Sequence, residues 1–173
     1  GLKPRNKEQV FAINLLNDSE IPIVTLVGKA GCGKTLLAIA AGLDQVLEKR
    51  MFKKLIVSRP IQPLGKDIGY LPGTMEEKMK PWLMPIQDNI DFLLNGESKS
   101  MEMFFEDGTI QIEALTYIRG RSISNAFIII DEAQNLTIHE LKTIITRVGE
   151  NTKIVLTGDI EQIDSVYLDA TSN

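Results

Sequence analysis

The eight residues from Gly28 to Thr35 read GKAGCGKT and match the spacing G-x-x-x-x-G-K-[ST] at every fixed position. A short apolar run precedes them and an apolar, helix-like stretch follows, which is the context in which this spacing forms a phosphate-binding loop. Glycines let the backbone curl so that its amide groups face phosphate oxygens, and a helix N-terminus adds partial positive charge. We therefore expect a nucleotide to contact Gly28, Lys29, Ala30, Gly31, Cys32, Gly33, Lys34, Thr35 and Leu36.

Two side chains of this segment carry its chemistry. The Lys34 ammonium can neutralise the β- and γ-phosphates of a nucleoside triphosphate, and the Thr35 hydroxyl can hold Mg²⁺. Cys32 is interpreted as a small side chain at an unconstrained position. The competing interpretation of the whole segment is a glycine-rich turn with a chance lysine, which the flanking strand and helix disfavour.

A second segment, FIIIDEAQ at residues 127–134, is an apolar strand that ends in two carboxylates. We expect Asp131 to orient Mg²⁺ through its water shell and Glu132 to polarise a water for attack on the γ-phosphate. The adjacent glutamate favours hydrolysis over transfer, because the nucleophile of a small-molecule kinase is its substrate rather than water. Acidic residues also begin ordinary loops after strands, but the phosphate loop upstream disfavours that interpretation.

A third polar segment, TGDIEQ at residues 157–162, also follows an apolar run. Taken alone it is only a turn with a polar tail. As the third such segment after a strand, it predicts that Asp159 and Gln162 reach the γ-phosphate or its attacking water.

Arginine side chains are the candidates for contacts with other molecules. Arg59 ends a predicted strand, and Arg119 and Arg121 form an R-G-R sequence before the acidic strand. These residues are expected to meet nucleic-acid phosphates or to reach the ATP of a neighbouring subunit. The alternatives are solvated surface arginines or partners of carboxylates. Trp82 is expected in the core, and a single histidine, His139, with a single cysteine gives no basis for a zinc site.

Hydrophobic patterns predict the elements that position these residues. Apolar runs indicate strands at 23–27, 54–58, 110–114, 127–130 and 153–157, the first of them buried. Helical spacing indicates helices at 7–16, 34–49 and 137–148, and a capping box of Thr137 with Glu140 begins the last. Strands that alternate with helices predict an α/β fold with a parallel sheet covered on both faces.

The middle of the chain is harder to interpret. Residues 59–73 are expected to form a long loop that is functional or mobile. A capping box of Thr74 with Glu77 predicts a short helix that Pro81 interrupts, and a helical stripe follows from Trp82 to Leu93. Residues 95–109 show little pattern.

A parallel sheet would place the candidate site residues at one edge. Ligands of parallel sheets bind at the carboxyl ends of the strands. The polar segments follow Val27, Ser58, Ile130 and Thr157, so we expect four separate segments to meet at that edge.

Composition sets broad limits. The 173 residues are 43% hydrophobic and 24% charged, as in a single globular domain. No apolar run approaches the ~20 residues of a membrane helix, and one cysteine suits a reducing compartment, so we expect a cytoplasmic protein without membrane contact. The net charge of −4 implies that any nucleic-acid site is a local basic patch.

The motifs also resemble a known family. GKAGCGKT, IIIDEAQN and GDIEQ are similar to the nucleotide-binding motifs of the first RecA-like domain of superfamily-one helicases, and Gln9 stands where those proteins have an adenine-reading glutamine. Longer stretches resemble the PhoH family of ATPases: SRPIQPLGKDIGYLPG, EEKMKPWLMPIQDNID, YIRGRSISNAFIIIDEAQN and DSVYLDATSN. PWLMPIQDN and KPRNKEQ resemble the subgroup in which a PIN nuclease domain precedes the ATPase.

This resemblance implies a three-layer α/β/α, RecA-like P-loop NTPase fold, ATP hydrolysis with Mg²⁺, a homo-oligomeric ring such as a hexamer, and single-stranded RNA as a partner. It implies that Lys34 and Thr35 contact phosphate and metal, that Asp131 orders the metal waters, and that Glu132 acts on the attacking water. It further implies that Gln162 senses the γ-phosphate. Cys32 departs from the family, which often has threonine there. Because the family continues past DATSN, residues 1–173 are expected to be one domain of a longer protein.

Three functional hypotheses follow. The first is an ATPase whose work on RNA, such as unwinding, depends on self-assembly. The second is a P-loop phosphotransferase for a small molecule, which Glu132 disfavours. The third is a non-hydrolysing ATP sensor that serves as an interaction module.

Overall fold

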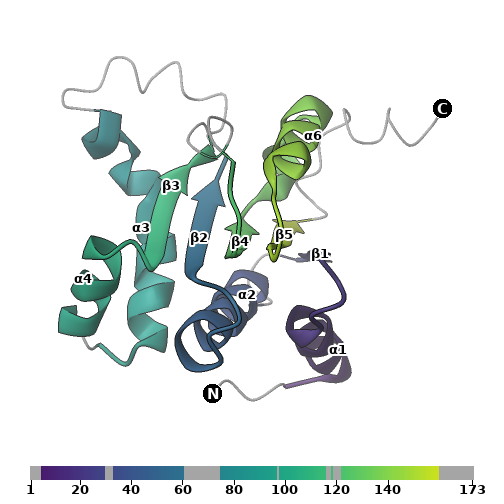
Figure 1. Cartoon of the computed structure of the whole chain (residues 1–173), viewed down its shortest axis with the longest axis horizontal. Coiled ribbons are helices and arrows are strands. Elements are labelled where there is room, and N and C mark those ends of the chain that lie inside the picture. The colour runs from purple at the N-terminus through teal and green to yellow at the C-terminus, as the bar shows by residue number, and fades with distance from the viewer. Residues whose placement is uncertain are drawn as a thin grey trace.

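The computed structural model describes residues 5–29, 33–60, 75–96, 98–115, 118 and 122–159. Its centre is a five-stranded sheet in the order β1-β5-β4-β2-β3, and every neighbouring pair of strands is parallel (Figure 1). The strands are β1 (Ile23–Gly28), β2 (Lys54–Arg59), β3 (Ile110–Ala114), β4 (Ala126–Ile130) and β5 (Lys153–Asp159). All five predicted strands are therefore present.

The α-helices are α1 (Lys7–Asn17), α2 (Lys34–Leu43), α3 (Met75–Leu93), α4 (Ser98–Glu106) and α6 (Ile138–Arg147). A π-helical turn (Asp44–Glu48) continues α2, and a 3₁₀ turn (Ala133–Asn135) follows β4. In the described part of the chain, no helix combines the length and apolar character needed to cross a bilayer.

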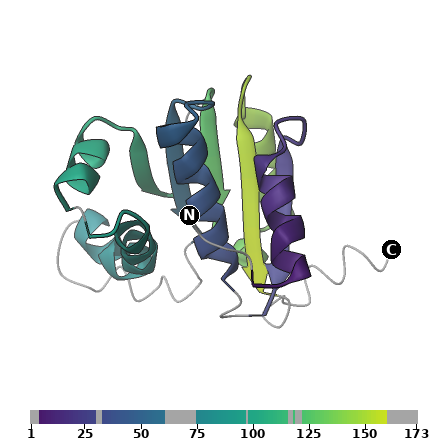
Figure 2. The same cartoon turned by 90° about the horizontal axis from the view of Figure 1, so that it is seen from below.

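Helices cover both faces of the sheet. Alternate residues of β4 point to opposite sides: Phe127 and Ile129 join a core with residues of α1–α4, whereas Ile128 and Ile130 join a second core that includes Ile144 of α6. Figure 2 shows α1 and α2 along the same face of the sheet. This confirms the predicted three-layer α/β/α architecture.

The structure corrects the prediction that β1 is a buried strand, because one of its faces is exposed. It is the first strand in the sheet order, and its side chains alternate between buried and exposed. Val24 and Leu26 pack into the core with α1 and α2, whereas Ile23 and Val27 are exposed on the other face. A short apolar run predicts a strand but does not show whether both of its faces are covered.

The helix α3 also corrects a prediction, because Pro81 does not interrupt it. The helix runs for 19 residues through both Pro81 and Pro85. Each proline removes one intrahelical donor, and the complete burial of Ile86 and Ile90 against the sheet helps to offset that loss. The predicted apolar stripe is present at Ile86 and Ile90, whereas the Trp82 side chain lies outside the described residues.

Other predictions of the middle region had mixed outcomes. The helix α4 lies within residues 95–109, where no pattern was recognised, and its Phe104 and Phe105 pack against the core. The long loop from residue 61 on and the capping box of Thr74 lie outside the described residues. The capping box of α6 is confirmed: the Glu140 N–H donates to Thr137 Oγ1 at 3.1 Å, and the Thr137 N–H donates to Glu140 Oε1 at 3.3 Å.

A buried lysine ties β5 to α1. Lys153 is 2% exposed, and its ammonium donates to the carbonyl oxygens of Leu15 at 2.8 Å and Asp18 at 2.7 Å. These carbonyls belong to the end of α1, and each also accepts a backbone N–H, from Asp18 and from Ile21 respectively, at 3.3 Å. Burial lowers the pKa of Lys153 below its usual 10.5, and the Asp18 carboxylate opposes that shift.

We predict that Lys153→Met lowers the free energy of unfolding by about 1–3 kcal/mol, because two carbonyls each lose a hydrogen bond from a charged donor. The folded protein binds the Lys153 proton less tightly than the unfolded chain. The stability of the wild type relative to the variant therefore rises as pH approaches 10.5. Urea denaturation at several pH values measures both effects, with Lys142→Met on the exposed side of α6 as the control. Equal stabilities at every pH would contradict this role.

Candidate functional site

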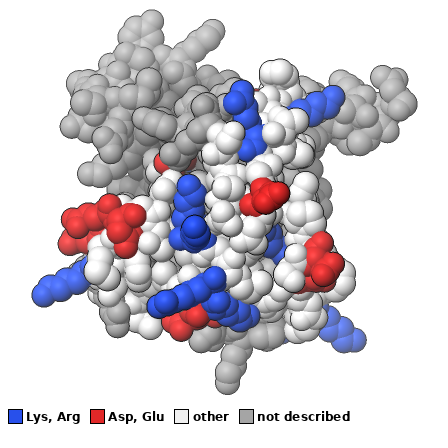
Figure 3. Space-filling model, in the orientation of Figure 1, with Lys and Arg blue, Asp and Glu red and all other residues white. Residues whose placement is uncertain are grey.

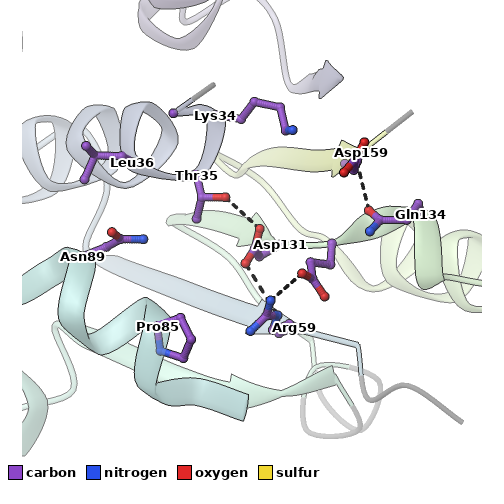
Figure 4. A pocket seen from close by; sticks show the side chains of 12 residues that line it. Lys34, Thr35, Leu36, Arg59, Pro85, Asn89, Asp131, Gln134 and Asp159 are labelled. Carbon is purple, nitrogen blue, oxygen red and sulfur yellow. Dashed lines mark hydrogen bonds and ion pairs between the residues drawn. The ribbon is translucent and has the colours of Figure 1, made fainter. Parts of the chain in front are cut away.

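A cavity of about 430 Å³ lies at the carboxyl edge of the sheet. The start of α2, the end of β2, one side of α3, the turn after β4 and the end of β5 all contribute to its walls (Figure 4). As expected, segments far apart in the sequence meet at this edge.

The entry to α2 has the geometry of a phosphate-binding loop at the residues that are described. Gly33 caps the helix with φ +82°, a left-handed conformation that favours glycine. The next residue, Lys34, donates from its ammonium to the carbonyl oxygens of Gly28 at 2.7 Å and Lys29 at 3.1 Å. The lysine thus lies across the first residues of the loop, beside the N-terminus of α2.

The carboxylate of Asp131 is the centre of the site. Its Oδ1 atom accepts hydrogen bonds from Thr35 Oγ1 and Thr157 Oγ1, each at 2.8 Å. Its backbone N–H donates to the Ser58 carbonyl oxygen at 2.8 Å. Asp131 is 8% exposed, so these donors stabilise a carboxylate that is largely removed from water. Residues from α2, β2 and β5 therefore fix its position.

Glu132 has a strained backbone and a cationic partner. Its φ of +53° and ψ of +45° lie in the left-handed region, which is uncommon for residues other than glycine and clusters at functional sites. Its Oε1 atom accepts a hydrogen bond from Arg59 Nη2 at 2.5 Å. Arg59 Nε also lies 3.7 Å from Asp131 Oδ2. Arg59 thus pairs with two carboxylates of its own chain. This agrees with the alternative in which this arginine is the partner of carboxylates.

The turn after β4 contacts the end of β5. The Asp159 N–H donates to Gln134 Oε1 at 3.2 Å, and both residues are buried (Figure 4). A Cβ atom on Gly158 would lie 3.3 Å from that same oxygen, so a small residue suits this close approach.

Sequence reasoning missed Pro85, Asn89 and Gln134 in the wall of the cavity, and Thr157, whose hydroxyl donates to Asp131 Oδ1. Thr157 lies at the end of an apolar run, directly before the GD sequence. A polar residue at the carboxyl end of a predicted strand indicates a place at the site. Pro85 and Asn89 are four residues apart on α3 and therefore share one face of the helix. Both lie within the predicted helical stripe from Trp82 to Leu93, but the period of a helix does not show which face borders a cavity.

A second cavity, of about 450 Å³, contains Gln9 in its wall. It lies between α1 and the beginning of the loop, and Gly28, Lys29 and Lys34 also line it. Because Lys34 lines both cavities, the two adjoin. The Gln9 side chain accepts a hydrogen bond from the Arg5 N–H at 2.6 Å, and the rest of its amide is suited to recognition of a polar ring edge.

The donors around Asp131 fit a hard divalent cation. A hydroxyl, Thr35 Oγ1, and a carboxylate stand 2.8 Å apart, and oxygen ligands of this kind suit Mg²⁺. The described residues contain no cluster of three or more His, Cys, Asp or Glu side chains that could hold a metal. Mg²⁺ commonly keeps several waters and takes phosphate oxygens as ligands instead of using an all-protein cage.

Six predicted site residues lie outside the described residues and stay predictions: Ala30, Gly31, Cys32, Arg119, Arg121 and Gln162. His139 is exposed, in agreement with its interpretation as a surface residue.

Comparison with known proteins identifies the relatives of this chain. The profile of the family described as "PhoH-like protein" matches residues 1–172. Protein PhoH2 of Bacillus subtilis (strain 168) is 60% identical over 175 residues, which cover 100% of this chain and 40% of that protein. Protein PhoH2 of Thermobispora bispora is 44% identical over 167 residues, which cover 96% of this chain and 38% of that protein. The chain thus spans about two fifths of the length of these curated relatives.

A solved structure shows the same fold. The large terminase from a thermophilic bacteriophage aligns with 90% of this chain and 39% of its own, with a TM-score of 0.51 and 11% identity. The motif, the family and this fold together describe a P-loop NTPase domain.

The contribution of the hydrogen bonds around Asp131 to stability can be tested. We expect Thr157→Val to lower the free energy of unfolding by about 1–2 kcal/mol, because a buried carboxylate oxygen loses one of its donors while the side-chain volume is kept. Thr25→Val, the same change on an exposed residue of β1, is the matched control. Urea denaturation compares the two variants. If both lose the same stability, the Thr157 hydroxyl does not support Asp131.

Proposed function

Since the chain belongs to the PhoH-like protein family, we propose that it is a domain that binds ATP with Mg²⁺ and hydrolyses it. The observation that carries this proposal is the hydrogen bond between Thr35 and Asp131, which joins the start of α2 to the end of β4 across 96 residues of sequence. It places a phosphate-binding loop, a metal-binding pair and the Glu132 carboxylate in one cavity.

Nucleotide binding uses the loop and the start of α2. Backbone amides of residues 28–35 surround the phosphates, and the Lys34 ammonium exchanges its two carbonyl partners for phosphate oxygens. A charged acceptor makes a stronger hydrogen bond than a neutral carbonyl, so this exchange favours binding. The base enters the adjoining cavity, where Gln9 reads its edge.

Thr35 and Asp131 would hold Mg²⁺. When bound, the ion neutralises charge that develops on the β- and γ-phosphates. The Thr157 hydroxyl keeps the Asp131 carboxylate in place.

Glu132 orients and deprotonates the water that attacks the γ-phosphate. Its backbone conformation directs the carboxylate into the cavity, where Arg59 and Asp131 are its neighbours. Gln134 and Asp159 lie at the same edge, and we propose that they and Gln162 detect whether the γ-phosphate is present. These residues connect the chemistry to the ends of β4 and β5.

The wider assembly is proposed from the family resemblance. We place single-stranded RNA near Arg119 and Arg121 and propose that the chain works in a cytoplasmic homo-oligomeric ring, as one domain of a longer protein. On the face drawn in Figure 3, the described Lys and Arg side chains are interspersed with Asp and Glu. A local site therefore fits better than a broad basic surface.

We predict that Lys34→Ala weakens ATP binding by about 10- to 100-fold, because charge-assisted hydrogen bonds of about 1.5–3 kcal/mol are lost. Fluorescent ATP titration measures the affinity, and Lys142→Ala on α6 is the matched control. Equal affinities in the two variants would remove Lys34 from the site.

We predict that Glu132→Gln lowers ATP turnover by about 10²- to 10⁴-fold, the usual contribution of a general base, while ATP binding is retained. Phosphate release, measured with and without RNA, checks this outcome. Wild-type turnover that needs a small acceptor would instead support the phosphotransferase hypothesis. Wild-type binding without turnover would support the sensor hypothesis.

A further inference from the structure

Arg59 is joined to both acidic residues of the cavity. Its Nη2 atom donates to Glu132 Oε1 at 2.5 Å, and its Nε atom lies 3.7 Å from Asp131 Oδ2. The side chains of Arg59 and Glu132 are only 17% and 30% exposed. Solvent therefore screens this pair less than an ion pair at the open surface, and the pair competes with any other partner of either group.

The contact has a consequence for catalysis. The proposed role of Glu132 is to accept a hydrogen bond and then a proton from the attacking water. Its Oε1 atom already accepts a hydrogen bond from a permanently charged guanidinium. A carboxylate held in this way is less available to a water, because one of its oxygens is already occupied. Glu132 therefore needs Arg59 to move before it acts.

The cavity supplies a reason for that movement. Arg59 lines the same cavity as Lys34 and Thr35, the residues proposed to bind phosphate and metal. A γ-phosphate adds negative charge and several acceptor oxygens there, and the planar fork of a guanidinium matches phosphate geometry well. A divalent cation beside Asp131 repels Arg59 from that carboxylate. Both effects favour transfer of Arg59 from Glu132 to the terminal phosphate.

We propose that Arg59 is a positioning residue that holds Glu132 until a triphosphate arrives, and that it then binds the γ-phosphate within the same chain. This inference rests on the proposed function as an ATPase. It assigns to Arg59 a contact in its own subunit instead of one with nucleic acid or with a neighbouring ATP. ADP, which lacks the γ-phosphate, leaves the pair of Arg59 with Glu132 in place.

Separation of Arg59 from Glu132 costs free energy, and only the binding of a triphosphate offsets that cost. Part of the binding free energy of ATP is used to separate Arg59 from Glu132, so the apparent affinity is lower than the intrinsic one. Neutralising Glu132 weakens the pair and removes that cost. Removing Arg59 removes both the cost and the new contact with the γ-phosphate. A merely structural ion pair would change ATP and ADP binding equally.

Affinities for AMP-PNP and ADP, each with Mg²⁺, test this in four proteins: wild type, Glu132→Gln, Arg59→Ala and the double variant. We expect Glu132→Gln to bind AMP-PNP about three- to tenfold more tightly than the wild type, a modest relief for one partly buried ion pair. We expect Arg59→Ala to weaken AMP-PNP binding about tenfold through loss of a guanidinium–phosphate contact, with ADP binding unchanged. In the double variant, the gain from Glu132→Gln disappears.

Controls separate this mechanism from a loss of folding. Arg147→Ala, at an exposed arginine of α6, should leave both affinities unchanged, and thermal unfolding confirms that each variant is folded. Arg59→Lys keeps the charge but not the planar fork, so it should restore only part of the AMP-PNP affinity.

The outcomes are distinct. Equal loss of AMP-PNP and ADP binding in Arg59→Ala, or a gain from Glu132→Gln that persists without Arg59, overturns the role of Arg59 and leaves the ATPase proposal standing. A wild type that binds neither nucleotide overturns both.

Discussion

The structure of the site depends on one buried carboxylate. Asp131 is largely removed from water, and such a group is stable only where donors surround it. Its donors and its cationic neighbour come from Thr35, Thr157 and Arg59, which belong to α2, β5 and β2. To satisfy this carboxylate, the chain must bring three separate segments to the end of β4. The same requirement that stabilises the fold therefore assembles the site.

Strand order makes this assembly possible. β5 lies between β1, which leads to the phosphate loop, and β4, which leads to the carboxylates. Parallel pairing sets Gly28 beside Asp159 and Ile130 beside Leu156, so β4 ends three residues earlier than β1 and β5, and the turn after β4 follows the last residues of β5. Thr157 is thereby within reach of Asp131, and Gln134 is within reach of Asp159. Polar groups that are far apart in the sequence are thereby joined by hydrogen bonds at this edge of the sheet.

The polar groups of the site are partnered within the protein, and function then requires exchange of partners. Lys34 binds loop carbonyls, and Arg59 binds the Glu132 carboxylate. A triphosphate with a divalent cation offers a charged alternative to each of these contacts. Under the proposed function, binding and activation are linked in this way, because the groups released from one another are those proposed to contact the phosphates. The geometry favours a site that rearranges when it is filled.

The sequence alone determined the local parts of this protein. The phosphate-loop spacing, the acidic pair after an apolar strand, the five strands and the capping box of Thr137 are all patterns within short segments, and the described residues contain the strands, the acidic pair and the capping box as predicted. The tertiary structure decided the contacts between elements, which patterns within short segments cannot encode. The partner of Arg59, the role of Thr157, the exposed face of β1 and the continuity of α3 through two prolines each depend on which element lies alongside. Local spacing records the period of an element, whereas contacts between distant residues are set by strand order and by the burial of apolar faces.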